Sequence, residues 1–154
     1  MSTVKVENSV PNSNNIPTWF WIVSGIMLLW NLIGLGIFGI MMSIIGNGEA
    51  MTAAKLNEAQ QELINSTPSW VNIAFGVAVI FGVLACIALL MRRKFALPLF
   101  VISLLGVLVQ NTYVFFMSNS VEIMEGVGMA PLVILIAILL IPFTIFCLSK
   151  GWLR

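Results

Sequence analysis

The stretch Ala88-Leu89-Leu90-Met91-Arg92-Arg93-Lys94-Phe95-Ala96-Leu97 decides the fold, because it places a dense cluster of charge between two long apolar runs. The whole chain has 154 residues, of which 60% are hydrophobic and 8% charged, and its mean hydropathy is +1.05. Such values lie outside the range of soluble domains and predict a membrane protein. Short loops rich in Lys and Arg face the cytoplasm. The triplet Arg92, Arg93 and Lys94 is therefore predicted to set the topology as a cytoplasmic turn.

Apolar runs long enough to cross a bilayer as a helix occur four times. They predict an all-α membrane protein with one four-helix transmembrane domain over residues 17–149, with spans at about 17–45, 68–91, 95–117 and 130–149. Residues 46–67 are more polar, and Leu56, Ala59 and Leu63 recur there at helical spacing. This pattern predicts one short amphipathic helix from about Thr52 to Ile64.

The distribution of charge around these spans predicts the orientation. One basic residue, Lys55, falls on the side away from the triplet, and six fall on its own side: Lys5, Arg92, Arg93, Lys94, Lys150 and Arg154. Aromatic residues favour the membrane interfaces, and they form two groups that agree with this assignment: Trp19, Trp21 and Trp152 inside, Trp70 and Tyr113 outside.

We therefore expect both termini in the cytoplasm, with residues 1–16 as a disordered tail and residues 150–154 as a short cytoplasmic end. Segment 46–67 and the loop at 118–129, with Glu122 and Glu125, are expected on the periplasmic side.

The residue types that are missing argue against catalysis. The chain has no His and no Asp, and its remaining reactive side chains are not grouped with a base. We expect no enzymatic activity, no metal and no cofactor, and a net charge of +1 gives no basis for nucleic-acid binding. Cys86 and Cys147 lie inside apolar runs, so we expect both to be inert core residues.

Within the spans the sequence shows a neutral polar set: Asn31, Ser103, Gln110, Asn111 and Tyr113. Asn31 and Gln110 stand about equally far from the inner ends of their helices, so we expect them to meet at one depth. An unpaired amide is costly in lipid, so these side chains should point inward. Two interpretations stay open, namely hydrogen bonds that hold helices together and a site for a neutral solute.

Small residues predict close helix packing. Ala74, Ala78, Gly82 and Cys86 recur every four residues, which forms a ridge that another backbone can approach. Gly34, Gly36 and Gly39 match the spacing GxGxxG, but they lie inside an apolar run with no strand before them, so packing is favoured over dinucleotide binding. The partner of these faces, within the chain or in a second copy, stays open.

Four segments carry a resemblance to a known group of proteins: residues 30–34, 67–70, the run from Ala88 through the basic triplet to Gln110, and the ending 150–154. In these segments the chain resembles small bacterial four-span inner-membrane proteins that are often labelled "sugar transporter". The resemblance implies a multi-pass protein of the bacterial inner membrane.

Two functional hypotheses follow from the resemblance and the composition. The first is a facilitator for a small neutral, sugar-like solute that acts as an oligomer. The second is an accessory subunit that packs against a larger membrane complex. The expected partners are the lipid bilayer, other copies of the chain or another membrane protein, and a neutral solute.

Overall fold

The computed structural model describes residues 16–118 and 129–153, and every regular element within them is a helix. The predicted tail at 1–16 falls outside this part except for Ile16, and the loop with Glu122 and Glu125 falls outside it as well. The elements in chain order are α1 (Thr18–Ile44), α2 (Gly48–Ala53), α3 (Glu58–Ser66), α4 (Ser69–Leu90), α5 (Ala96–Thr112), the π-helical segment η1 (Tyr113–Met117) and α7 (Met129–Ser149).

Four helical spans are long and apolar enough to cross a membrane: Thr18–Ile44, Ser69–Leu90, Ala96–Met117 and Pro131–Ser149. These bounds agree with the four predicted spans to within about two residues at each end. The prediction of an all-α protein with four long apolar helices is therefore confirmed. Large apolar side chains such as Ile26, Ile73 and Leu105 cover the outer surface of the bundle, as contact with lipid requires.

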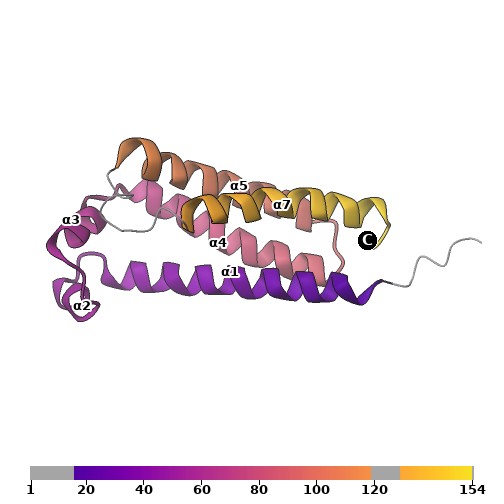
Figure 1. The fold of residues 1–154 in the computed structure, drawn as a ribbon, viewed down its shortest axis with the longest axis horizontal. Helices are drawn as coiled ribbons and strands as arrows, with labels where there is room; N and C mark the ends of the chain where they lie inside the picture. Colours follow the sequence, from indigo (N-terminus) through magenta and orange to yellow (C-terminus); the bar gives the residue numbers. More distant parts are fainter. Residues whose placement is uncertain (1–15, 119–128, 154) are drawn as a thin grey trace, which may run out of the picture.

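The four long helices lie side by side in a bundle (Figure 1). The closely packed pairs are α1 with α4, α4 with α5, and α5 with α7. In contrast, α1 and α7 are not a closely packed pair. The bundle is therefore an open row of four helices that curves around a space between its first and last members.

The connection between α1 and α4 differs from the prediction. A single helix from Thr52 to Ile64 was expected, but α2 and α3 are separated at residues 54–57. Lys55 has a left-handed backbone with φ 58°, which ends α2. Asn57 then starts a new helix through a capping box with Gln60. The prediction of one helix was wrong because residue periodicity does not detect this local cap.

One end of the bundle carries most of the described positive charge. Arg92, Arg93, Lys94 and Lys150 gather near the α4–α5 turn and the end of α7, and we call this the basic end (Figure 1). Segments α2 and α3 lie at the opposite end with Glu49, Glu58 and Glu62. The predicted separation of charge is present in the structure, whereas the assignment of the basic end to the cytoplasm stays a prediction.

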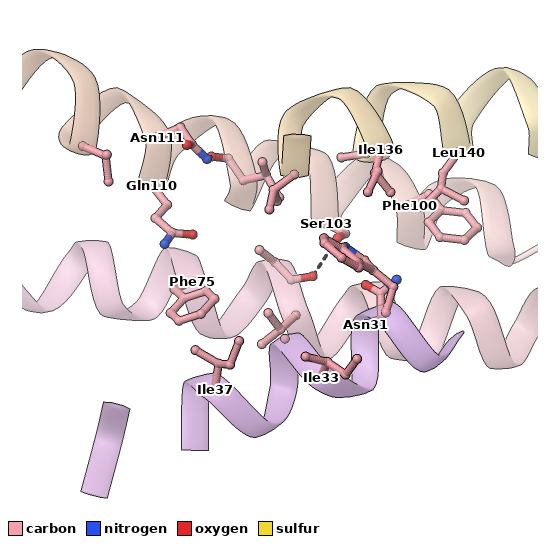
Figure 2. Close-up of a pocket in the computed structure, with 18 residues that line it drawn as sticks. Asn31, Ile33, Ile37, Phe75, Phe100, Ser103, Gln110, Asn111, Ile136 and Leu140 are labelled. Atoms are coloured by element: carbon pink, nitrogen blue, oxygen red, sulfur yellow. Dashed lines mark hydrogen bonds between the residues drawn. The ribbon is translucent and has the colours of Figure 1, made fainter. Parts of the chain in front are cut away.

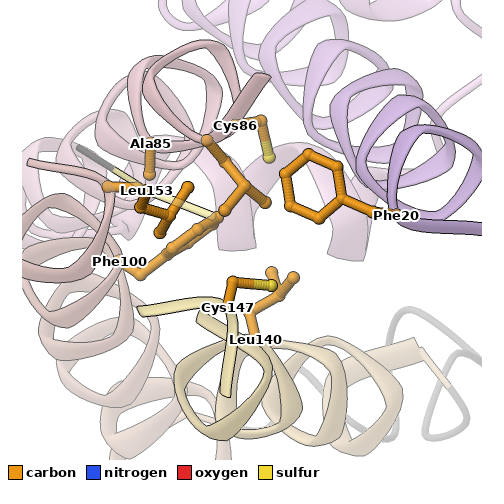
Figure 3. Close-up of a cluster of buried hydrophobic side chains, with 9 residues drawn as sticks. Phe20, Ala85, Cys86, Phe100, Leu140, Cys147 and Leu153 are labelled. Atoms are coloured by element: carbon orange, nitrogen blue, oxygen red, sulfur yellow. The ribbon is translucent and has the colours of Figure 1, made fainter. Parts of the chain in front are cut away.

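A cluster of buried side chains closes the bundle at the basic end (Figure 3). It joins Phe20 of α1, Cys86 of α4, Phe100 of α5 and Cys147 of α7, together with Leu153 beyond α7. Both cysteines are free and buried, in agreement with their expected place in the core.

Aromatic rings extend this closure toward the surface. The Trp19 and Trp152 ring centroids lie 5.6 Å apart, and Phe20 stacks at 6.3 Å on Phe143 of α7. At the basic end, therefore, α1 and α7 are linked by rings rather than by close backbone packing.

Candidate functional site

A cavity of about 360 Å³ lies between the four long helices. Its walls include Trp30 and Ile37 of α1, Phe75 of α4, Gln110 of α5 and Ala137 of α7 (Figure 2). It occupies the space where α1 and α7 are not closely packed, and it borders the cluster that closes the basic end, because Phe100 and Leu140 belong to both. The volume is at the lower end of the range of about 300 to 1,000 Å³ that is typical of small-molecule sites.

Four of the five predicted polar residues line this cavity, namely Asn31, Ser103, Gln110 and Asn111. The fifth, Tyr113, does not. Its ring is buried and packs perpendicular to Trp70 at a centroid distance of 5.7 Å. Tyr113 belongs to η1, where the helix widens into π geometry, and the contact with Trp70 holds it on the side of α5 that faces α4. Tyr113 therefore does not line the cavity with the other four residues, and its assignment to the polar group stays a prediction.

Asn31 is held by its own helix and by α4. Its Nδ2 donates to the Met27 carbonyl oxygen at 2.9 Å and lies 3.5 Å from the Cys86 sulfur. The side-chain oxygen sits directly over Gly82, where a Cβ atom would collide with it. The NH2 group of Asn31 is therefore satisfied, and the side chain serves as a contact between α1 and α4.

Ser103 ties α5 to α4. Its hydroxyl donates to the Ala78 carbonyl oxygen at 2.6 Å, and the residue is 8% exposed. Because the hydroxyl proton is used in this bond, Ser103 can offer the cavity only a lone pair. Asn111 is partly used, since its Nδ2 donates to the Val107 carbonyl oxygen of its own helix at 2.8 Å and keeps a second N–H.

Gln110 differs from these three residues. Its side chain is partly exposed to the cavity and forms no hydrogen bond with the residues that the structure describes. Trp30 also lines the cavity, and its indole N–H likewise has no hydrogen-bond partner within residues 16–118 and 129–153. Polar groups without partners are unfavourable in contact with hydrocarbon. These two groups therefore offer a bound molecule hydrogen bonds that the helices do not use.

Asn31 and Gln110 do not meet, contrary to expectation. Figure 2 shows Asn31 near Ser103 and Gln110 toward the other end of the cavity. The expectation assumed that the helices start at one level, but α1 extends past the α4–α5 turn at the basic end (Figure 1). Counting from helix starts therefore placed Asn31 too far from that end.

The small residues of α4 pack within the chain. A Cβ on Gly106 of α5 would lie 2.8 Å from both the Ala74 carbonyl oxygen and the Ala78 nitrogen, so the two backbones are in direct contact. Gly82 receives Asn31, and a Cβ on Gly34 would meet Val79 at 3.4 Å. This result favours an intramolecular partner for the predicted packing residues Gly34, Ala74, Ala78 and Gly82. Gly106 belongs with them, and its spacing from Ser103 and Gln110 was the signal in the sequence.

The topology-setting triplet forms the α4–α5 turn. Arg92 has a left-handed backbone with φ 60°, and its Nε donates to the Trp152 carbonyl oxygen at 2.8 Å. Arg93 and Lys94 are exposed. The turn is thus attached to the segment that follows α7.

Within the part of the chain that the structure describes, no three His, Cys, Asp or Glu side chains gather as a metal site. The cavity walls contain no ionisable residue. The site can therefore bind a neutral molecule through apolar contact and a few hydrogen bonds.

Comparison with known proteins finds no matching family model, no matching curated protein and no matching solved structure. The resemblance to the four-span proteins thus stays a prediction.

Proposed function

We propose that the protein is a membrane facilitator that binds a small neutral molecule in the cavity between α1 and α7. The observation that carries the proposal is the unpaired Gln110 amide in a cavity of about 360 Å³ without ionisable walls. Hydrocarbon offers this amide no hydrogen bond, whereas a molecule with a hydroxyl, carbonyl or amide group does.

The available hydrogen-bonding groups favour a mainly apolar ligand over a sugar. A sugar presents several hydroxyls, and each needs a partner once it leaves water. Asn31 and Ser103 already donate to the protein, and Asn111 uses one of its two N–H groups in this way, which leaves Gln110, the Trp30 indole and one Asn111 N–H as free donors. The remaining walls are apolar, so a short hydrocarbon body with one amide or hydroxyl matches them better than a polyol.

The facilitator role rests on the open side of the bundle. The backbones of α1 and α7 are not closely packed within a single chain, although both helices contribute side chains to the cavity. A second copy that covers this side would complete a pathway, which fits the expected oligomer.

Flux into proteoliposomes tests the proposal. Swelling measured by light scattering should show that the protein accelerates entry of hexanamide more than entry of xylitol. Gln110→Leu should reduce the protein-dependent rate at least tenfold, since one lost hydrogen bond to a ligand is worth about 1.4 kcal/mol. Lys55→Gln, a change far from the cavity, is the matched control and should leave the rate unchanged. Equal rates with and without protein for both solutes would overturn the proposal.

One observation favours the second hypothesis, an accessory subunit. Gly25, Gly36 and Gly39 of α1 are exposed, and a Cβ at each would meet nothing within 4 Å. At 3.6 residues per turn they fall within about 60° of one another, on the face of α1 opposite Gly34. Such a face lets another helix approach closely.

Substitution separates the two hypotheses. Gly36→Leu with Gly39→Leu should release a partner protein that co-purifies in mild detergent if the chain is an accessory subunit. A facilitator that needs no partner would keep hexanamide flux after the same change.

A further inference from the structure

A second site lies at the basic end, where the α4–α5 turn meets the segment after α7. The Arg92 amide donates to Leu89 and the Arg93 amide to Ala88, which is the hydrogen-bond pattern of a helix end that usually has glycine in the left-handed position. Here Arg92 takes that position, at a cost of about 1 to 2 kcal/mol for a side chain with a Cβ.

The Arg92 guanidinium is held but only partly used. Its Nε donates to the Trp152 carbonyl oxygen at 2.8 Å, which fixes the group against the segment after α7. Its Nη2 is buried and has no hydrogen-bond partner within the described residues. Arginine presents a rigid fork of donors that matches the oxygens of a phosphate. The Arg92 guanidinium is therefore held in place with a donor, Nη2, for which the described residues supply no acceptor.

The surroundings add positive charge and no described negative charge. Arg93 and Lys94 follow in the same turn, and Lys150 precedes Trp152 by two residues, with its Nζ 5.5 Å from the centre of the Phe146 ring. The described carboxylates lie on α2 and α3 at the opposite end of the bundle (Figure 1). No ion pair joins any of these cations to another residue within 16–118 and 129–153. The site is thus complementary to an anion.

Apolar side chains flank the cations, and this identifies the anion as part of a lipid. Met91 is 62% exposed and Phe95 69% exposed, one on each side of the triplet. Trp19 and Trp21 are exposed nearby, as expected of residues at the membrane interface. A soluble anion would use the cations alone, whereas a phospholipid uses the cations for its headgroup and the apolar flanks for its chains.

We propose that the corner formed by Arg92 and Trp152 binds the phosphate of an anionic phospholipid, with Arg93, Lys94 and Lys150 around the headgroup. Basic pockets between helices at the interface bind anionic lipids in this way. The site is separate from the cavity, so it stands whether or not the cavity transports a solute.

Native mass spectrometry of the full chain in detergent tests the proposal, with phosphatidylglycerol and phosphatidylcholine of identical chains as probes. We expect the wild type to retain phosphatidylglycerol at least tenfold better than phosphatidylcholine. Arg92→Gly keeps the left-handed turn without strain, and it should abolish the preference while the protein stays folded by circular dichroism. Lys55→Gly is the matched control, because Lys55 is also a cation with a left-handed backbone but lies at the other end. It should leave the preference unchanged.

A second variant guards against loss of fold. Arg92→Lys retains the charge without the fork of donors and should lower retention about threefold to tenfold. Equal retention of the two lipids by the wild type, or unchanged preference in Arg92→Gly, would overturn the proposal. Displacement of phosphatidylglycerol by inorganic phosphate at equal concentration would also overturn it, because the site would then bind a free anion.

Discussion

The α4–α5 interface and the α1–α7 side of the bundle differ in how closely their helices pack. Along α4 and α5 the side chains are so small that the backbones touch, with Gly106 against Ala74 and Ala78. Between α1 and α7 the same bundle keeps a cavity and an unpaired amide. Close backbone packing between α4 and α5 stabilises the bundle. Looser packing between α1 and α7 leaves space in which a molecule can bind.

The largest expected effect is on the tight interface. Gly106→Ala introduces a Cβ at 2.8 Å from two backbone atoms that cannot rotate away. It should lower the free energy of unfolding by about 1 to 3 kcal/mol. The matched control is Gly36→Ala on the exposed side of α1, which meets nothing within 4 Å and should not lower the free energy of unfolding, since Ala favours a helix over Gly by about 0.5 to 1 kcal/mol. Denaturant unfolding in mild detergent measures both, and equal losses would show that the interface is not in backbone contact.

The contact between Gly82 and Asn31 should show a smaller effect that a second change repairs. Gly82→Ala places a Cβ against the Asn31 side-chain oxygen and should cost about 1 kcal/mol. Asn31→Ala in the same background should restore part of this loss, because the colliding amide is gone. A double-mutant cycle of unfolding free energies checks the coupling. Strict additivity of the two changes would contradict the packing of Asn31 over Gly82.

The sequence predicted the tight region better than the open one. Repeats of small residues such as Ala74, Ala78 and Gly82 indicate close approach whatever the partner, so helix packing can be inferred from spacing. The cavity depends on which helices fail to touch, and spacing within one helix contains no such information. The prediction that Asn31 and Gln110 lie at one depth is wrong because spacing within a helix also does not give the offset between helix starts. A pattern of α-helical spacing also does not predict the π geometry of η1, which begins at Tyr113.

Ser103 lies where the α4–α5 interface meets the cavity. Ser103→Ala removes the hydrogen bond to the Ala78 carbonyl oxygen and should lower stability by about 0.6 kcal/mol, the average for such bonds in membranes. The same unfolding assay measures this change. A loss above about 2 kcal/mol would mean that the bond, rather than the fit of Gly106, holds the interface.

The smallest effect on stability is expected in the open region. Ala137→Leu adds side-chain volume to a residue that lines the cavity and is half-buried. Because space is available there, the free energy of unfolding should change by less than about 0.5 kcal/mol. Protein-dependent hexanamide flux should fall at least fivefold, since the added side chain occupies the binding space. Strong destabilisation with unchanged flux would indicate a packed interior.

The most direct measurement is titration of the protein in nanodiscs with hexanamide, followed by tryptophan fluorescence, because Trp30 lines the cavity. The proposed site predicts a saturable change in the wild type that is lost in Trp30→Phe and shifted to at least tenfold higher concentration in Gln110→Leu. A change that never saturates, or one that is the same in all three proteins, would contradict a binding site between α1 and α7.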